Sequence, residues 1–325
     1  METTTTATKP TTTDYSYRFA FTDTETWLPY LKDKGFVVVS GVVTPEDSKR
    51  VIQEMKKCLQ KFSPNLIDEK SFTQDKNYPY MLHGGMVQYV GHSKFQWELR
   101  EKVAPIFAKV WDCKETDLAT SFDGFCYMDG RRKYKRQHPL SFVHSDQSPK
   151  RDCLWSVQGL VNLNDCGEND GGLVLIPESH KIHQETFKKF NKQHVEMDWY
   201  KFTNEEKRDP LFQNYIKICG KAGDFMMWDS RVFHCNTVPT TPNVRACVYV
   251  CQVPKSMVPQ DTIKKRSMAW MGRRCSSHQP GDGFRSFPVV PQYADELIAE
   301  IAPQVAIGDD ELTDLQKSLL HVEYN

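Results

Sequence analysis

The sequence has no excess of either charge. Lysine and arginine together number 42, as do aspartate and glutamate, so the formal net charge is zero. Nucleic acids and anionic membrane surfaces attract proteins that carry a surplus of basic residues. The balance therefore argues against either as the main partner. The longest apolar run, residues 36–43 (FVVVSGVV), is too short and too polar to cross a bilayer.

The ten cysteines show no metal-binding or disulfide pattern. No pair has the CxxC spacing, and the 325-residue chain is long enough to form a core without disulfides. No Asn-x-Ser/Thr acceptor is present, and no charged-then-apolar signal segment opens the chain. We therefore expect reduced thiols, buried as small apolar side chains, in a protein located in the cytoplasm.

The order of the patterns predicts an α+β protein built around one sheet-based core. Residues 1–15 include a Thr-rich stretch that we expect to be a disordered tail. We interpret residues 16–325 as one domain, with a helical part at 16–118, a β-rich core at about 119–255 and a helical part at 256–325. No internal repeat and no linker divides it.

Helical spacing and capping residues locate the helices. Thr44, followed by Pro45, is typical of a helix N-terminus, and Gly35 of a helix end. The helices are expected near 24–34, after Thr44, and at 94–111, 293–305 and 312–320. Short β-type runs occur at 36–41, 121–128, 154–164, 173–177, 224–230 and 245–254. Residues 64–92 are predicted to be a long loop.

Two histidines and one aspartate form the candidate metal site. His144 and Asp146 lie two apart in an extended segment, so both side chains point to the same side. His234 comes from another predicted strand. Two imidazoles and a carboxylate on one face form the facial triad of non-haem Fe(II) oxygenases. The spacing alone is common, and His194 and His321, which also precede an acidic residue by two, are assigned no function.

Arg245 opens the last predicted strand, eleven residues after His234. We expect its strand to pair with the one that follows His234. A cosubstrate that chelates Fe(II) through an α-keto acid carries a second carboxylate at its far end, and a buried carboxylate needs a cation. The planar fork of arginine matches that group.

These segments resemble the phytanoyl-CoA dioxygenase family, a branch of the Fe(II)/2-oxoglutarate oxygenases. The resemblance covers roughly residues 30–255, and it lies in His144-Ser145-Asp146, in residues 170–180 (DGGLVLIPESH), in Gly223-Asp224, and in His234 followed by Arg245. It implies a double-stranded β-helix (jelly-roll) core, flanked by helices, with iron in its mouth. It also implies 2-oxoglutarate and O2 as cosubstrates.

The resemblance further implies that the strand through Gln158, Leu160 and Asn162 lines the cosubstrate pocket. Gln158 and Asn162 are polar residues in an apolar strand, so they need partners if buried. They either contact 2-oxoglutarate or a metal ligand, or form ordinary core hydrogen bonds. Asn236 carries the same two interpretations. Halogenating relatives replace the acidic ligand by glycine or alanine, so the presence of Asp146 predicts oxygen chemistry.

The expected reaction oxidises an unactivated C–H of a small, acidic metabolite and releases succinate and CO2. Hydroxylation, desaturation and oxidative ring closure, as in kainoid-type secondary metabolism, stay open. The basic run 131–136 is either a solvated loop or a surface for anionic substrates. Residues 78–88 are a candidate lid or an ordinary loop. Trp228 and Arg231 are assigned no catalytic role.

Three alternatives remain. The first is an acyl-CoA hydroxylase of the phytanoyl-CoA type, although the chain shows no peroxisomal C-terminal signal. The second is a protein side-chain hydroxylase. The third is a non-catalytic metal-binding jelly-roll, which has no need of a keto-acid anchor such as Arg245. The sequence is silent on oligomeric state.

Overall fold

In the computed structural model, two sheets face each other and helices cover the outside of the larger one. The structure describes residues 15–66, 68, 70–71, 85–132, 134, 138–287 and 292–323. The Thr-rich tail and most of the candidate lid lie outside these residues. Among them, no helix combines the length and the apolar character needed to span a bilayer.

The larger sheet has eight strands in the order β1-β2-β11-β7-β13-β5-β3, with β4 paired to β13. Its strands are β1 (Arg18–Ala20), β2 (Phe36–Ser40), β3 (Met86–Val87), β4 (Leu118–Thr120), β5 (Phe125–Asp129), β7 (Val157–Asn162), β11 (Phe225–Asp229) and β13 (Val244–Pro254). Only the β1–β2 pair is parallel. Strands from the N-terminal part thus extend the sheet formed by the middle of the chain, and β3 lies within the segment that was predicted to be a loop.

The smaller sheet has five strands in the order β10-β8-β12-β6-β9. Its strands are β6 (His144–Ser145), β8 (Gly172–Leu175), β9 (Tyr200–Lys201), β10 (Ile216–Lys217) and β12 (His234–Thr237). Side chains from both sheets share one apolar cluster, which includes Leu160 and Trp228 of the larger sheet and Leu173 and Leu175 of the smaller. This interior, closed between two antiparallel sheets, is the predicted jelly-roll core.

Most of the described helices form where the sequence predicted them. They are α1 (Thr24–Lys34), α2 (Pro45–Phe62), α3 (Lys94–Trp111), α4 (His183–Lys189), α5 (Gln260–Met271), α6 (Gln292–Val305) and α7 (Asp314–Leu320). Thr44 caps α2 by accepting a hydrogen bond from the Asp47 amide, and Gly35 ends α1 in the left-handed conformation. Helix α4 was not predicted.

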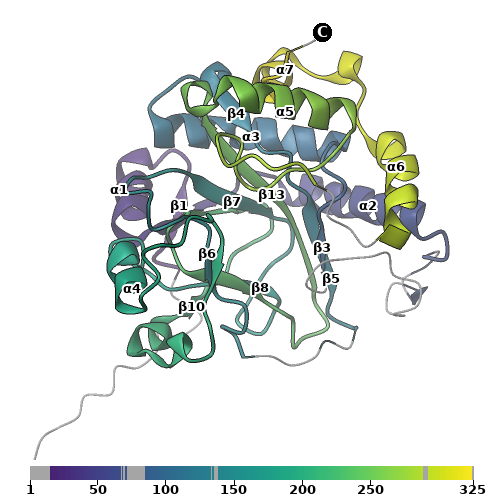
Figure 1. Cartoon of the computed structure of the whole chain (residues 1–325). Helices are drawn as coiled ribbons and strands as arrows, with labels where there is room; N and C mark the ends of the chain where they lie inside the picture. Colours follow the sequence, from purple (N-terminus) through teal and green to yellow (C-terminus); the bar gives the residue numbers. More distant parts are fainter. Residues whose placement is uncertain are drawn as a thin grey trace, which may run out of the picture.

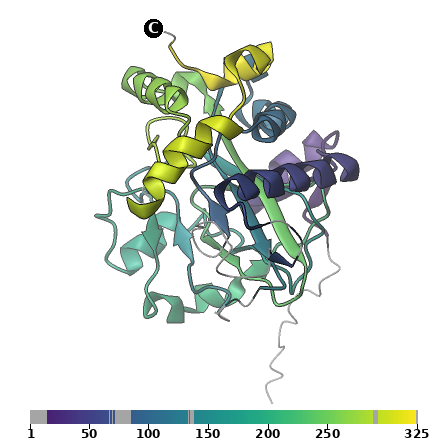
Figure 2. The ribbon, with the colours of Figure 1, turned by 90° about the vertical axis from the view of Figure 1, so that its right-hand side faces the viewer.

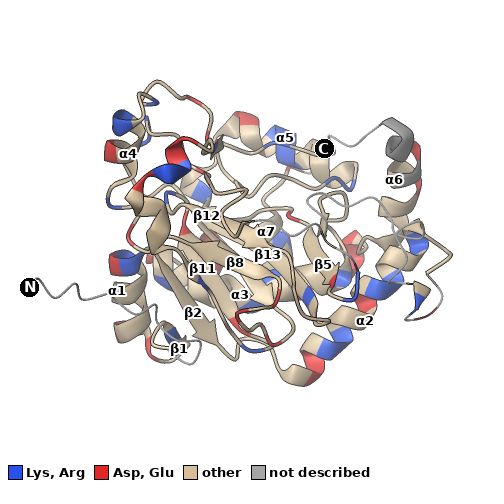
Figure 3. Ribbon diagram, turned by 90° about the horizontal axis from the view of Figure 1, so that it is seen from below, with Lys and Arg blue, Asp and Glu red and all other residues tan. Residues whose placement is uncertain are grey.

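A second and larger core joins the outer face of the larger sheet to the helices. It includes Trp27 of α1, Met55 of α2, Phe107 of α3 and Leu319 of α7. Figures 1 and 2 show the helices of the N-terminal and C-terminal parts gathered around the larger sheet, with α3, α5 and α7 together at one end. In Figure 3 the charges concentrate on helices and loops, and the strands are largely free of them. The helices thus support the sheet from behind and leave the space between the sheets for the site.

All ten cysteines are free thiols, and eight of them are buried. This agrees with the interpretation of the cysteines as small apolar core residues.

Candidate metal centre and active site

His144 and His234 face each other across two neighbouring strands of the smaller sheet. The two residues are directly opposite in the antiparallel pairing of β6 with β12, and their ring centroids lie 4.3 Å apart. Asp146 follows β6. One ligand atom from each of the three buried residues lies within 4.8 Å of the others, so the set can hold a metal ion. The structure thus brings together the three residues that the spacing suggested.

The same kind of backbone contact sets the orientation of both imidazoles. The Nδ1 atom of His144 lies 2.9 Å from the Phe142 carbonyl oxygen, and Nδ1 of His234 lies 2.9 Å from the Val232 carbonyl oxygen. A carbonyl only accepts, so each ring carries its proton on Nδ1 and presents the Nε2 lone pair to the interior. The Asp146 Oδ2 atom lies 3.6 Å from Nε2 of His144 and 3.4 Å from Nε2 of His234.

The electrostatics favour the protonation states that a metal requires. Burial, together with the neighbouring His144, lowers the pKa of His234, which favours a neutral imidazole. Burial alone would raise the pKa of Asp146, but the two histidines hold it well below its usual value. A neutral His234 beside an ionised carboxylate suits Fe(II).

Gln158 and Trp228, on neighbouring strands of the larger sheet, contact two of the three candidate metal ligands. Gln158 donates a hydrogen bond of 3.0 Å from Nε2 to Oδ2 of Asp146. The ring centroid of Trp228 lies 5.0 Å from the ring centroid of His234. Sequence reasoning gave Trp228 only a packing role, because nothing in its strand shows which histidine it would meet.

His183 is a further contact that sequence reasoning missed. Its Nε2 atom lies 2.9 Å from Ser145 Oγ and 3.1 Å from the Gln147 carbonyl oxygen. Helix α4 therefore fixes the backbone on both sides of Asp146. Burial lowers the pKa of His183 to about 4, so the ring is neutral at pH 7.

Arg245 lies between the sheets as a buried cation without a carboxylate. Its Nη2 atom donates a 2.6 Å hydrogen bond to Oδ1 of Asn236, and its buried Nη1 atom has no hydrogen-bond partner. Among the residues that the structure describes, no carboxylate pairs with this guanidinium. The predicted pairing of its strand was wrong, because β12 and β13 belong to different sheets. The side chains of Arg245 and Asn236 meet across the interior instead.

The other two positions of β7 differ from Gln158. Leu160 packs into the apolar cluster between the sheets. The Asn162 amide donates to the carbonyl oxygens of Asn164 and Lys221, at 2.5 and 3.0 Å. These contacts favour an ordinary core hydrogen bond for Asn162, and its cofactor-binding role stays a prediction.

Several motif residues stabilise turns rather than the site. Asp224 is buried and accepts hydrogen bonds from Arg18 Nε and the Lys221 amide, each 2.8 Å long. Arg131, in the basic run, pairs with Asp129. The described part of the chain also has a cavity of about 840 Å³ that Asn236 lines and none of the three candidate metal ligands does. Cavity size alone therefore does not locate the site.

Two imidazoles and a carboxylate between jelly-roll sheets, with an unpaired guanidinium in the same interior, define the class of non-haem iron oxygenases that use a keto-acid cosubstrate. The family model described as phytanoyl-CoA dioxygenase (PhyH) matches residues 31–247, and the chain belongs to this family. It is therefore an Fe(II)- and 2-oxoglutarate-dependent dioxygenase.

Known proteins resemble the chain at moderate to low identity. "Ava biosynthesis cluster protein O" of Aspergillus versicolor is 27% identical over 268 residues, which are 78% of this chain and 85% of that protein. A "putative phytanoyl-CoA dioxygenase" of Dictyostelium discoideum is 26% identical over 117 residues, 36% of this chain and 32% of that protein. A crystal structure of hypothetical protein JW0805 from Escherichia coli aligns with a TM-score of 0.58 at 15% identity, over 94% of this chain and 85% of that one. This last match shows the shared fold alone.

Proposed function

We propose that His144, Asp146 and His234 bind Fe(II), and that Arg245 binds the distal carboxylate of 2-oxoglutarate. The observation that carries the proposal is the buried Arg245 guanidinium, whose Nη1 atom has no partner. An unpaired buried cation is costly, whereas an arginine that meets a carboxylate forms strong charge-assisted hydrogen bonds. A dicarboxylate cosubstrate supplies that group.

The residues present fit the metal. Two neutral nitrogen donors and one carboxylate oxygen, all on one side, leave the opposite coordination positions open for a chelating keto acid and O2. Hydrogen bonds that the Nδ1–H groups donate to the Phe142 and Val232 carbonyl oxygens hold the imidazoles in the tautomer that a metal needs. When bound, Fe(II) with 2-oxoglutarate and O2 supplies the oxidising power for an unactivated C–H.

The chain itself contributes position and exclusion of water. Gln158 orients the Asp146 carboxylate, and Asn236 orients the Arg245 guanidinium. Leu173, Leu175 and Trp228 make the interior between the sheets apolar. A dry interior strengthens the contact between Arg245 and a carboxylate and limits side reactions with water.

For the reaction, we propose oxidation of a small, acidic metabolite by hydroxylation, desaturation or ring closure. The Aspergillus relative named for a biosynthesis cluster supports a role in secondary metabolism. We propose that residues 16–325 act as one catalytic unit, because strands from the N-terminal part pair within the sheet that carries Arg245. Hydroxylation of an acyl-CoA or of a protein side chain is the second candidate function, favoured by membership of the family alone.

The test is an anaerobic titration of the metal-free protein with Fe(II) and then 2-oxoglutarate, followed by the visible metal-to-ligand charge-transfer band. We expect a band in the wild type and none in His144→Ala. Arg245→Gln should need at least ~100-fold more 2-oxoglutarate for the same band, because it loses a charge-assisted bidentate contact. His321→Ala, which changes a histidine at the end of α7, is the matched control and should behave like the wild type.

Two results would contradict the assignment. The first is an unchanged band in His144→Ala. The second is an unchanged 2-oxoglutarate requirement in Arg245→Gln, which would mean that another cation binds the distal carboxylate.

A further inference from the structure

A second histidine–aspartate pair lies at the edge of the same interior. The Nδ1 atom of His278 lies 2.8 Å from Oδ1 of Asp123, and the Asp123 side chain is 1% exposed. Oδ2 of Asp123 accepts a 2.7 Å hydrogen bond from Ser121 Oγ. The His278 side chain is 27% exposed, and no other polar contact of it is found among the described residues. The pair therefore presents one open N–H donor.

Two cationic side chains, Arg100 and His278, lie beside Asp123. Arg100 is fully buried, and its Nη2 atom donates to the Asp123 backbone carbonyl at 2.9 Å. No carboxylate pairs directly with Arg100 in the part of the chain that the structure describes. Burial opposes a charge on His278, yet the adjacent Asp123 raises its pKa to about 9. The Asp123 carboxylate thus pairs directly with His278, and Arg100 lies nearby as a second cation.

His278 lies on the metal side of the larger sheet. Its ring centroid is 5.7 Å from that of Tyr249. Residues 245, 247 and 249 alternate onto the inner face of β13, so Tyr249 continues the row that begins at Arg245. The row is about 13 Å long at ~3.3 Å per residue. Asp146 is among the carboxylates that raise the pKa of His278. An anion on His278 is therefore separate from the carboxylate on Arg245.

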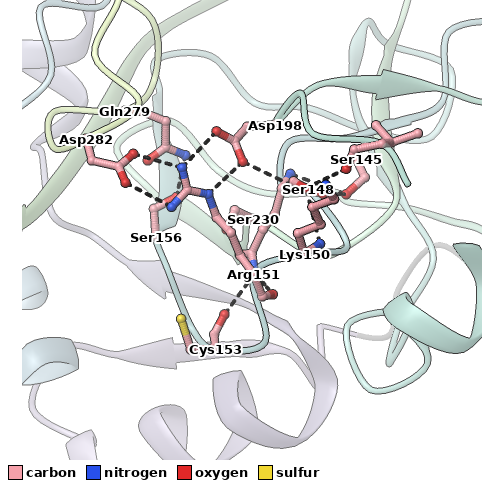
Figure 4. Close-up of polar contacts among 12 residues, drawn as sticks. Ser145, Ser148, Lys150, Arg151, Cys153, Ser156, Asp198, Ser230, Gln279 and Asp282 are labelled. Carbon is pink, nitrogen blue, oxygen red and sulfur yellow. Dashed lines mark hydrogen bonds and ion pairs between the residues drawn. The ribbon is translucent and has the colours of Figure 1, made fainter. Parts of the chain in front are cut away.

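The segment that carries His278 is held firmly in place. Gln279 donates a 2.7 Å hydrogen bond to Ser156 Oγ, immediately before β7. Arg151 forms two hydrogen bonds with Asp282, at 3.0 and 2.8 Å, as Figure 4 shows. These contacts fix the backbone around His278 before any ligand binds.

Arg151 also contacts the segment that carries an exposed aromatic side chain, Trp199. Arg151 binds Asp198 at 2.8 and 3.3 Å, and the next residue, Trp199, is 43% exposed. The Trp199 ring lies 6.1 Å from the ring of His144. Arg151 therefore connects the segment that carries His278 to the segment that carries Trp199. The first segment offers a polar donor, His278. The second offers the exposed aromatic face of Trp199 beside the candidate ligand His144.

We propose that His278, oriented by Asp123, binds the carboxylate of the substrate, while Trp199 packs against its apolar body. This inference rests on the proposed function of the metal site and names its substrate class, an amphipathic small acid. The donor is the His278 Nε2–H group. The reacting C–H would then belong to the part of the substrate between these two ends. Arg151 acts through these two residues and is a positioning residue.

The test uses the full chain as its anaerobic Fe(II) complex, saturated with 2-oxoglutarate. The probes are butanoate, hexanoate, octanoate and decanoate, each compared with its primary amide. The readouts are the shift of the charge-transfer band on binding and the stimulation of succinate release in air. We expect the acids to act at ~10-fold or more lower concentration than the amides, as a charge-assisted hydrogen bond predicts.

His278→Phe should abolish the preference for acids and leave the band of the Fe(II)–2-oxoglutarate complex unchanged. His278→Lys should retain the preference, because it keeps a cation. His194→Phe, at an exposed histidine, is the matched control and should behave like the wild type.

The two proposals fail in different ways. Absence of any band with Fe(II) and 2-oxoglutarate contradicts the proposed function. The carboxylate subsite is overturned if the wild type gives a normal band but acids and amides affect it equally. The same holds if neither kind of probe affects it. A His278→Phe variant that keeps the preference for acids also overturns the subsite.

Discussion

The Oδ2 atom of Asp146 accepts a 3.0 Å hydrogen bond from the Nε2 atom of Gln158. The same oxygen is the one that lies nearest the Nε2 atoms of the two histidines. A residue of the larger sheet thus sets the orientation of a carboxylate beside the smaller sheet. The two sheets have to keep their spacing for the three candidate ligands to converge.

This contact predicts the effect of Gln158→Leu. The variant removes the donor and leaves the Asp146 carboxylate free to rotate, so we expect Fe(II) affinity to fall roughly 10- to 100-fold, the range usual for contacts to metal-binding residues. Isothermal titration with Fe(II) under anaerobic conditions measures it. Asn164→Ala, which removes a side-chain hydrogen bond to the Val244 carbonyl, serves as control. Equal affinity in Gln158→Leu and the wild type would mean that packing alone orients Asp146.

Asn236 predicts a change in cosubstrate affinity without a change in metal affinity. Asn236→Ala removes the 2.6 Å contact that orients Arg245. We expect the KM for 2-oxoglutarate to rise about 10-fold, since a lost hydrogen bond to a charged group costs about 1.5–3 kcal/mol, partly offset by water. Succinate release at varied 2-oxoglutarate measures this, and Fe(II) affinity should stay constant. A parallel loss of Fe(II) affinity would argue against a separate role for Asn236.

His183 predicts a pH dependence of stability in the metal-free protein. Its folded-state pKa is about 4, below the unfolded value of ~6.5, because the ring is buried and neutral. The unfolded chain therefore takes up the proton first as the pH falls. The contribution of neutral His183 is complete above pH ~6.5 and is lost towards pH ~4, a change of roughly 3 kcal/mol.

The measurement is urea unfolding of the wild type and of His183→Asn at several pH values. Other groups titrate in both proteins, so the difference between the two curves isolates His183. We expect the wild type to lose its advantage between pH ~6.5 and ~4. A difference that is constant across this range would show that His183 has the same pKa in the folded and the unfolded protein.

Arg151 predicts an effect on the substrate side alone. Arg151→Met keeps an apolar stem over the Trp155 ring and removes the ion pairs with Asp198 and Asp282. We expect the acid probes to bind several-fold more weakly, and a loss of about 1 kcal/mol in the free energy of unfolding. The charge-transfer band with Fe(II) and 2-oxoglutarate should remain. Unchanged probe binding would show that the two segments keep their positions without Arg151.

Local patterns in the sequence predicted most of the helices and the convergence of the three candidate metal ligands. Thr44 and Pro45 define a helix start by their own backbone chemistry, and His144 and Asp146 share a face because they are two apart in an extended segment. Arg245 was predicted from its distance to His234, although its strand pairing was wrong, because pairing depends on the order of all the strands.

The rest depends on contacts between distant parts of the chain. His278 meets Asp123, and His183 reaches Ser145, only once the fold is complete. Neither histidine has a neighbour in sequence that distinguishes it from His194. Trp199 follows an ordinary polar segment, and nothing in that segment shows that it lies beside His144. Side-chain convergence of this kind has no local pattern.

The proposed binding of 2-oxoglutarate by the buried guanidinium of Arg245 also couples the stability of the fold to the cosubstrate concentration. A ligand that neutralises a charge present only in the folded interior stabilises the folded state, by about 2.7 kcal/mol when its concentration is a hundred times its Kd. The melting temperature should then rise with 2-oxoglutarate and fall when the cell consumes that metabolite. On the proposed function, the cosubstrate thus acts through this one residue as a stabilising component of the folded protein.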